Sequence, residues 1–155
     1  MKIIDNLSYA FSKDSKPVEY ADPGEILMFR TVDSYANSLK TEKDIITEKF
    51  DYTKCNPAAG PVYINGAEPG DVLVVEILDI KVAEQGVTPT FPGCGPLWDD
   101  IENRTRILSV INDTVNFNGV SWNITPMIGV IGMHRMENLL LVVFLDNMVA
   151  IWTVK

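Results

Sequence analysis

The strongest pattern in the chain is a pair of turn-and-strand units with the same order of polar and apolar positions. Each unit reads Ala, acidic residue, Pro, Gly, acidic residue, Ile or Val, Leu, and the units start at Ala21 and Ala67. A Pro-Gly pair suits the centre of a type II turn, because glycine accepts the positive φ needed there. The pattern predicts strands over residues 25–32 and 72–80. The second is nearly all apolar, which is typical of a strand buried on both faces or lying across a sandwich core.

The remaining pattern also favours short strands. Asn118-Gly119 predicts a hairpin between residues 114–117 and 120–124, because both turn residues tolerate positive φ. Thr41, followed by acidic residues and a spaced apolar face, predicts a helix over residues 41–50. We therefore expect an all-β fold, a β-sandwich with one short helix. Its other predicted elements are an edge strand within residues 8–22, strands over 104–111 and 126–132, and a long loop over 84–99.

Composition narrows the class of protein. The chain has 155 residues, enough for one domain with a real core, and is 46% hydrophobic and 22% charged. A net charge of −8 disfavours nucleic acid and anionic membranes as partners. The sequence shows no signal peptide and no run of about 18 apolar residues. Two cysteines are too few for a disulfide scaffold, so we expect a cytoplasmic protein.

Residues suited to catalysis are sparse. His134 is the only histidine, which excludes a metal site built from several histidines of this chain. Cys94 stands in a glycine-rich loop, where it is either a nucleophile that needs a nearby base or merely a small residue. Asp99 and Asp100 are adjacent and could be acids or metal ligands, although such pairs commonly face solvent or cap turns.

Asp33 and Asn37 are better candidates for a site, because they follow the first predicted strand, which would hold them in place. A structural role in the turn is the alternative, since Asp and Asn side chains bond readily to nearby backbone. We take Asp33 and Asn37 as the catalytic residues that this chain contributes.

A longer motif resembles a known family. The motif Asn-Pro-x-x-Gly-Pro-Val-Tyr-Ile-x-Gly-Ala-Glu-Pro-Gly-Asp-Val-Leu, over residues 56–73, is similar to the acetamidase/formamidase family, and the likeness extends from Pro23-Gly24 to residues 126–132. The resemblance implies a β-sandwich hydrolase that splits the C–N bond of small linear amides into ammonia and a carboxylate. It also implies a divalent metal, zinc or calcium, with ligands mostly outside this chain, and a homo-oligomer in the full-length form.

The end of the chain departs from the family pattern. Family members are longer and continue through Val-Ala-Pro and later His-Gly-Gly-Asn-Met-Asp, which is absent here as written. The codons of residues 147–155, regrouped from the third base, permit His-Gly-Gly-Asn-Met-Asp-Ser-Lys, and those of residues 133–137 permit Ala-Pro-Asp-Gly. We therefore expect residues 1–132 to be the N-terminal part of an amidase, and residues 133–155 to be a frameshifted, exposed apolar tail. The alternative is a genuine core strand or helix over residues 139–145.

These observations predict an amidase of the acetamidase/formamidase type whose 155-residue chain is truncated and inactive alone. The alternative is a non-catalytic β-sandwich module that binds a ligand or partner. Such a module should be soluble and unfold in one sharp transition, whereas a truncated enzyme should have open sheet edges and poor solubility.

Overall fold

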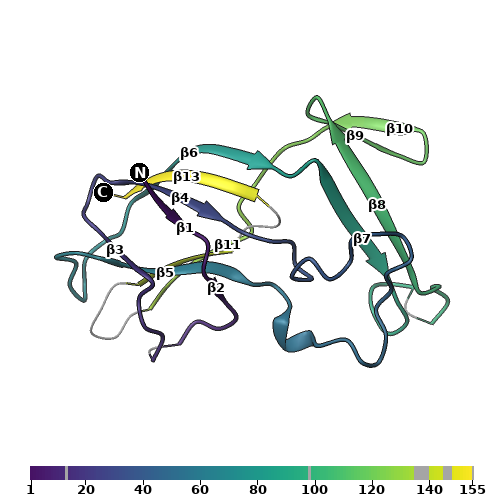
Figure 1. Cartoon of the computed structure of the whole chain (residues 1–155), viewed down its shortest axis with the longest axis horizontal. Coiled ribbons are helices and arrows are strands. Elements are labelled where there is room, and N and C mark those ends of the chain that lie inside the picture. The colour runs from purple at the N-terminus through teal and green to yellow at the C-terminus, as the bar shows by residue number, and fades with distance from the viewer. Residues whose placement is uncertain (13, 98, 135–139, 145–147, 155) are drawn as a thin grey trace.

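In the computed structural model, which describes residues 1–12, 14–97, 99–134, 140–144 and 148–154, the strands form two facing sheets and an arm (Figure 1). The all-β prediction is confirmed. The elements are β1 (Lys2–Ile4), β2 (Leu7–Ser8), β3 (Glu19–Ala21), β4 (Ile26–Arg30), the 3-10 helix η1 (Tyr52–Lys54), β5 (Ala58–Ile64), β6 (Val75–Val82), β7 (Gln85–Thr90), β8 (Arg104–Ile111), β9 (Thr114–Phe117), β10 (Val120–Asn123), β11 (Val130–His134), β12 (Leu140–Phe144) and β13 (Met148–Val154).

The two sheets share one hydrophobic core. The first has the order β1-β4-β13-β6, and the second has the order β11-β12-β5-β2 with β3 pairing β5 in parallel. Their buried side chains come from both layers, which identifies the sandwich: Ile4, Ala21, Leu27, Phe29, Ala59, Val62 and Ile64.

The arm is a third sheet with the order β10-β9-β8-β7, and it extends away from the sandwich (Figure 1). The predicted Asn-Gly hairpin is confirmed: Asn118 and Gly119 have φ of 51° and 82°, and Phe117 pairs with Val120. A second two-residue turn at Asn112 and Asp113, with φ of 48° and 56°, joins β8 to β9. Two tight turns in succession therefore give the arm its meandering order.

Both predicted Pro-Gly turns form, with matching hydrogen bonds. The N–H of Glu25 donates to the Asp22 carbonyl at 3.1 Å, and the N–H of Asp71 donates to the Glu68 carbonyl at the same distance. In each turn the second acidic side chain also accepts from the first acidic residue's N–H, at 2.8 Å and 2.9 Å. The two copies of the sequence motif thus form the same turn with the same two hydrogen bonds.

Of the two alternatives for residues 72–80, burial on both faces is wrong. The structure has a strand of the sandwich whose Val75, Ile80 and Val82 pack against the core. Strand β6 begins at Val75, and Ile77 and Leu78 are exposed. The reason is its place at the edge of the first sheet, where only β13 pairs with it among the described strands. Among the strands whose side-chain burial is described, β5 is the most buried, and it lies between neighbours on both sides and contacts the core.

The prediction of a helix over residues 41–50 is also wrong. A helix start forms, because Asp44 Oδ2 accepts from the N–H groups of Lys40 at 2.9 Å and Thr41 at 2.7 Å, as in a capping box. The turn does not propagate, since the Ile46 side chain is buried and its carbonyl accepts from the Asn103 side chain on the arm. Tertiary contacts therefore override the local helix signal, and η1 is the helix in the described residues.

The predicted loop over residues 84–99 is shorter than expected. Its first part is strand β7, which pairs with β8 from Gln85↔Ser109 to Thr90↔Arg104. Pro89 is tolerated in it because β7 is an edge strand, where the missing N–H can face outward.

The tail contributes paired strands. β12 lies between β11 and β5, and β13 lies between β4 and β6. Met133, the one residue of this tail whose side-chain burial is described, is exposed as expected, and the exposure of the rest lies outside the described side chains. The boundary at residue 132 with its frameshift stays a prediction. Among the described residues, no helix is both long and apolar enough to span a membrane.

Candidate functional site

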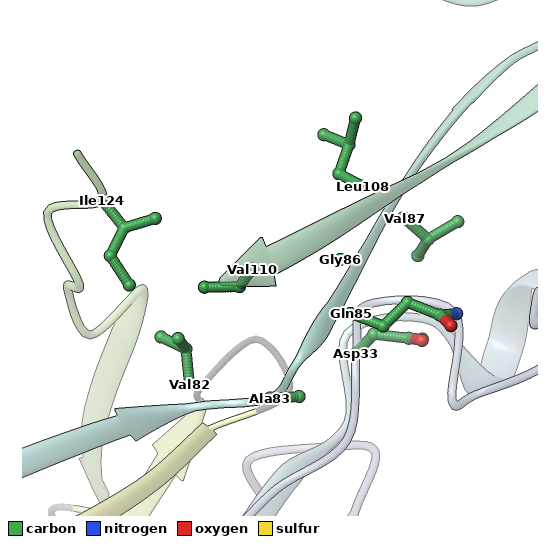
Figure 2. Close-up of a pocket in the computed structure, with 9 residues that line it drawn as sticks. All are labelled: Asp33, Val82, Ala83, Gln85, Gly86, Val87, Leu108, Val110 and Ile124. Atoms are coloured by element: carbon green, nitrogen blue, oxygen red, sulfur yellow. The ribbon is translucent and has the colours of Figure 1, made fainter. Parts of the chain in front are cut away.

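A small cavity lies where the arm leaves the sandwich, and it contains one of the two predicted catalytic residues (Figure 2). Its volume is about 210 Å³, and its walls come from the ends of β6 and β8, the start of β7 and three connecting segments. Most of the lining is aliphatic, with two polar side chains. The lining residues are Asp33, Val82, Ala83, Gln85, Gly86, Val87, Leu108, Val110 and Ile124.

Asp33 is held by the backbone of its own loop. The loop follows β4, and Asp33 is 6% exposed. Its Oδ1 accepts the N–H groups of Tyr35 and Asn37, both at 2.9 Å, and its carbonyl accepts the N–H of Ala36 at 2.9 Å. The two bonds to Oδ1 fix the carboxylate beside the cavity, and the bond to the carbonyl closes the turn that follows it.

Asn37 is close to Asp33 through its backbone. Ala36, just before it, has a φ of 52° in the left-handed region, and this turn directs the N–H of Asn37 back to Asp33 Oδ1, 2.9 Å away. Asn37 is not among the described residues that line the cavity. The structure thus brings the two predicted catalytic residues into one turn, and only Asp33 reaches the cavity wall.

Gln85 is a polar lining residue that sequence reasoning missed. Its side-chain Nε2 donates to the Lys40 carbonyl at 3.2 Å, which joins the start of β7 to the loop after Asp33. Gln85 and Asp33 both line the cavity, and Figure 2 draws them at the same end of it in this view. No local signal marks Gln85, because its importance comes from the meeting of segments far apart in the chain.

The other predicted candidates do not meet at this cavity. Cys94, Asp99 and Asp100 are exposed in the connection from the end of β7 to the start of β8. The cavity is lined by the start of β7 and the end of β8, so these three residues belong to the opposite end of the strands (Figure 1). His134 ends β11, and its side chain lies outside the described set.

The described residues do not fit a divalent metal by themselves. Among them, no group of three or more His, Cys, Asp and Glu side chains lies close enough to hold an ion. Asp33 stands beside aliphatic side chains and Gln85 in the cavity, and its Oδ1 already accepts two N–H groups. Zinc and calcium both need more ligands than this.

Comparison with known proteins identifies the family of this chain. A model of the acetamidase/formamidase family matches residues 6–143. The chain belongs to the acetamidase/formamidase family. It is similar to a Schizosaccharomyces pombe protein assigned as a formamidase, with 37% identity over 82 residues, 51% of this chain and 20% of that protein. It is also similar to the acetamidase of Mycolicibacterium smegmatis, with 44% identity over 48 residues, 31% of this chain and 11% of that protein.

Solved structures of this family share the fold. The acetamidase of Bacillus halodurans superposes with a TM-score of 0.85 at 25% identity, over 99% of this chain and 70% of that one. An acetamidase/formamidase predicted in the thermophile Thermoanaerobacter tengcongensis gives 0.84 at 26% identity, over 99% and 67%. The matched segments span a fifth or less of the two curated relatives.

Proposed function

We propose that this acetamidase/formamidase chain forms the N-terminal part of an amidase that hydrolyses the C–N bond of small linear amides to ammonia and a carboxylate. The observation that carries the proposal is the family match over residues 6–143, supported by the sandwich shared with two solved relatives. The remaining catalytic groups, including the ligands of any divalent metal, would lie outside this chain, so the chain alone should be inactive.

The cavity beside Asp33 suits a small amide. About 210 Å³ is the liquid volume of several water molecules and lies below the range of about 300–1,000 Å³ that is usual for drug-sized ligands. The side chains of Val82, Val110 and Leu108 would contact the acyl group and exclude water from it. The polar end at Asp33 and Gln85 would receive the amide group.

Asp33 would act as the proton carrier. Water attack on the amide carbonyl releases one proton that must reach the departing nitrogen, and a fixed carboxylate can transfer it. Because Oδ1 is held by two backbone N–H groups, the transfer would use Oδ2. In this proposal Asn37 contributes the N–H that orients the carboxylate.

A binding titration tests the cavity. Acetamide added to the methyl-labelled chain should shift the methyl resonances of Val82, Leu108 and Val110. Val110→Trp should abolish the shifts by filling the cavity, whereas Ile111→Trp should leave them, because Ile111 is the next residue on β8 and is not among the lining residues. Unchanged spectra in the wild type, or shifts that survive Val110→Trp, would contradict the assignment.

An ammonia assay tests the expected inactivity. The purified chain should release no ammonia from formamide or acetamide. Turnover that disappears in Asp33→Asn would show that the chain is an amidase at its present length. Turnover that persists in Asp33→Asn would contradict both the inactivity and the role of Asp33.

A further inference from the structure

A second pocket lies at the end of β7, whereas the cavity beside Asp33 lies at its start (Figure 1). Its volume is about 480 Å³, and none of its described lining residues also lines that cavity. Three parts of the chain that are distant in sequence meet there, and they contribute Thr47, Glu48, Tyr52, Phe91 and Asn103 to the lining. We call this the Tyr52 pocket, and the proposed amidase chemistry uses none of its residues.

Two neighbouring aromatic rings line the Tyr52 pocket. The centroids of the Tyr52 and Phe91 rings are 6.3 Å apart, and the ring planes are inclined at 48°. Phe50 packs edge-to-face against Tyr52, with centroids 5.1 Å apart, and holds that ring in place. Tyr52 is nevertheless 54% exposed, so much of its surface is open to a ligand.

Glu48 adds a negative charge to the same pocket. It lies in a turn that is closed by the Phe50 N–H, which donates to the Thr47 carbonyl at 2.9 Å. Within the described part of the chain Glu48 forms no ion pair, and no Lys, Arg or His lines the pocket. Lys49, the other central residue of the turn, is exposed and is not a lining residue. The Glu48 carboxylate is therefore available to a ligand.

Hydrogen bonds hold the pocket in shape. Asn103 Nδ2 donates to the Ile46 carbonyl, which joins the start of β8 to the segment of Glu48 and leaves Asn103 Oδ1 as an acceptor. Asp51 Oδ1 accepts the Thr53 N–H at 3.1 Å and so caps η1, which begins with Tyr52. Because these segments are already positioned, a ligand has little to order when it binds.

The combination of rings and carboxylate selects the charge of the ligand. The face of an aromatic ring attracts ammonium groups, and a carboxylate attracts them as well. An anion would be repelled by Glu48 and would find no cation in the described lining. A divalent metal needs several ligands close together, and the described residues offer no group of three His, Cys, Asp or Glu side chains.

We propose that the Tyr52 pocket binds a small organic cation, an ammonium group with apolar substituents. Glu48 supplies the opposite charge, and the rings of Tyr52 and Phe91 cover the apolar substituents. Since the pocket is open and Glu48 is exposed to water, binding should be weak, with dissociation in the millimolar range. The proposal does not depend on the proposed amidase function, which uses the cavity beside Asp33.

Two probes of the same shape test the proposal. Choline is the cation, and dimethylbutanol is its uncharged isostere, in which carbon replaces nitrogen. Each is titrated into the isotope-labelled 155-residue chain at constant ionic strength. Choline should shift the amide resonances of Glu48, Tyr52 and Asn103 until they saturate, and dimethylbutanol should bind at least about fivefold more weakly. Equal affinities for the two probes, or no saturable shift with choline, would overturn the proposal.

A glutamate pair tests the charge. Glu48→Gln should lower the affinity for choline to that for dimethylbutanol and leave dimethylbutanol binding unchanged. Glu68→Gln, in the connection from β5 to β6, removes the same charge elsewhere and should alter choline binding less than about twofold. An equal effect of the two variants would show attraction to the acidic chain as a whole and would overturn the site.

A tyrosine pair tests the ring. Tyr52→Leu should weaken choline binding about threefold or more, and Tyr52→Phe should retain it, because the ring remains. Tyr20→Leu is the matched control, since Tyr20 is similarly exposed and packs against Tyr63, with ring centroids 5.4 Å apart, on β3 of the sandwich. Far-ultraviolet circular dichroism checks that each variant is folded. Choline binding that is unchanged in Glu48→Gln or in Tyr52→Leu would contradict the proposal.

Discussion

Asp33 Oδ1 lies 2.9 Å from the backbone nitrogen of Asn37, and this bond closes the loop that follows β4. The same oxygen accepts the N–H of Tyr35, so one carboxylate satisfies two backbone donors. The turn alternative that the sequence left open is thus realised, together with a place for Asp33 on the cavity wall.

Replacing Asp33 should reveal its structural contribution. We expect Asp33→Ala to lower the free energy of unfolding by about 1–3 kcal/mol, because two N–H groups lose their acceptor. Asp33→Asn should cost less, since an amide oxygen can still accept. Urea unfolding measures both, with the exposed Asp5→Ala as a control that should change stability by less than about 0.5 kcal/mol. Equal losses for Ala and Asn would contradict the acceptor role.

The turn at Asp44 predicts a response to acid. Hydrogen bonds from the N–H groups of Lys40 and Thr41 lower the pKa of the Asp44 carboxyl below its ordinary value. A carboxyl with a lowered folded-state pKa stabilises the fold above its unfolded pKa, and this contribution is lost as the pH falls through the folded pKa. Stability should therefore decline below about pH 4.

The Asp44→Asn variant supplies the comparison. Its urea midpoint should change less with pH in that acidic range than the midpoint of the wild type. An identical decline in the two proteins would show that other groups cause the acid sensitivity.

The Asn-Gly turn of the arm predicts a difference between two glycines. Gly119 has a φ of 82°, which costs an alanine about 1–2 kcal/mol, so Gly119→Ala should lower the unfolding midpoint. Gly86 on β7 has no left-handed φ, and an added Cβ would lie 3.9 Å from the Leu108 carbonyl oxygen. Gly86→Ala should therefore be nearly neutral in the same unfolding experiment. A larger loss at Gly86 would contradict this account.

A buried hydroxyl offers a stabilising substitution. Thr105 is 1% exposed, and its Oγ1 has no hydrogen-bond partner within the described part of the chain. Thr105→Val has a similar shape and removes the unsatisfied oxygen, so we expect a gain of about 1 kcal/mol in unfolding free energy. Thr105→Ala should instead destabilise by leaving a cavity. Calorimetry compares the two, and a loss with Val would indicate that the hydroxyl has a partner.

The segment over residues 40–46 is attached to the arm by unequal contacts. Asn103 Nδ2 donates to the partly buried Ile46 carbonyl, and Arg106 Nη1 lies 3.4 Å from Glu42 Oε1 at the surface. Asn103→Ala should accelerate amide hydrogen exchange in this segment and cost about 1 kcal/mol. Glu42→Gln should cost less than about 1 kcal/mol, because exposed ion pairs contribute little. A larger stability loss for Glu42→Gln than for Asn103→Ala would contradict the conclusion that the Asn103 bond holds this segment to the arm.

Local signals predicted the turns and long-range contacts decided the rest. Pro-Gly and Asn-Gly pairs specify their own backbone geometry, and Gly24, Gly70 and Gly119 all have positive φ. The helix start at Thr41 was also read correctly, but Asn103 binds the Ile46 carbonyl from a position more than fifty residues later, and no local pattern contains that contact. A local sequence pattern therefore predicts structure only where the hydrogen bonds and backbone angles of a segment are set by that segment's own residues.

In the candidate site, too, the residue marked by a local signal was predicted and the residues brought in by long-range contacts were not. Asp33 was predicted because it closely follows a strand, and it reaches the cavity. Gln85, Leu108 and Ile124 were missed because they meet it only through the junction of arm and sandwich. Asn37 was predicted after the same strand, and its N–H bonds to Asp33 Oδ1, although its place in catalysis stays a prediction.

The position of β13 has a consequence for how the protein is made. β13 separates β4 from β6 and pairs with both, as in Ile151↔Met28 and Ile151↔Asp79. It leaves the ribosome after both of its neighbours. During synthesis, the edges of β4 and β6 that pair with β13 are therefore unpaired. Pairings between such distant segments form slowly. The nascent chain should therefore depend on chaperones until β13 emerges and joins the first sheet.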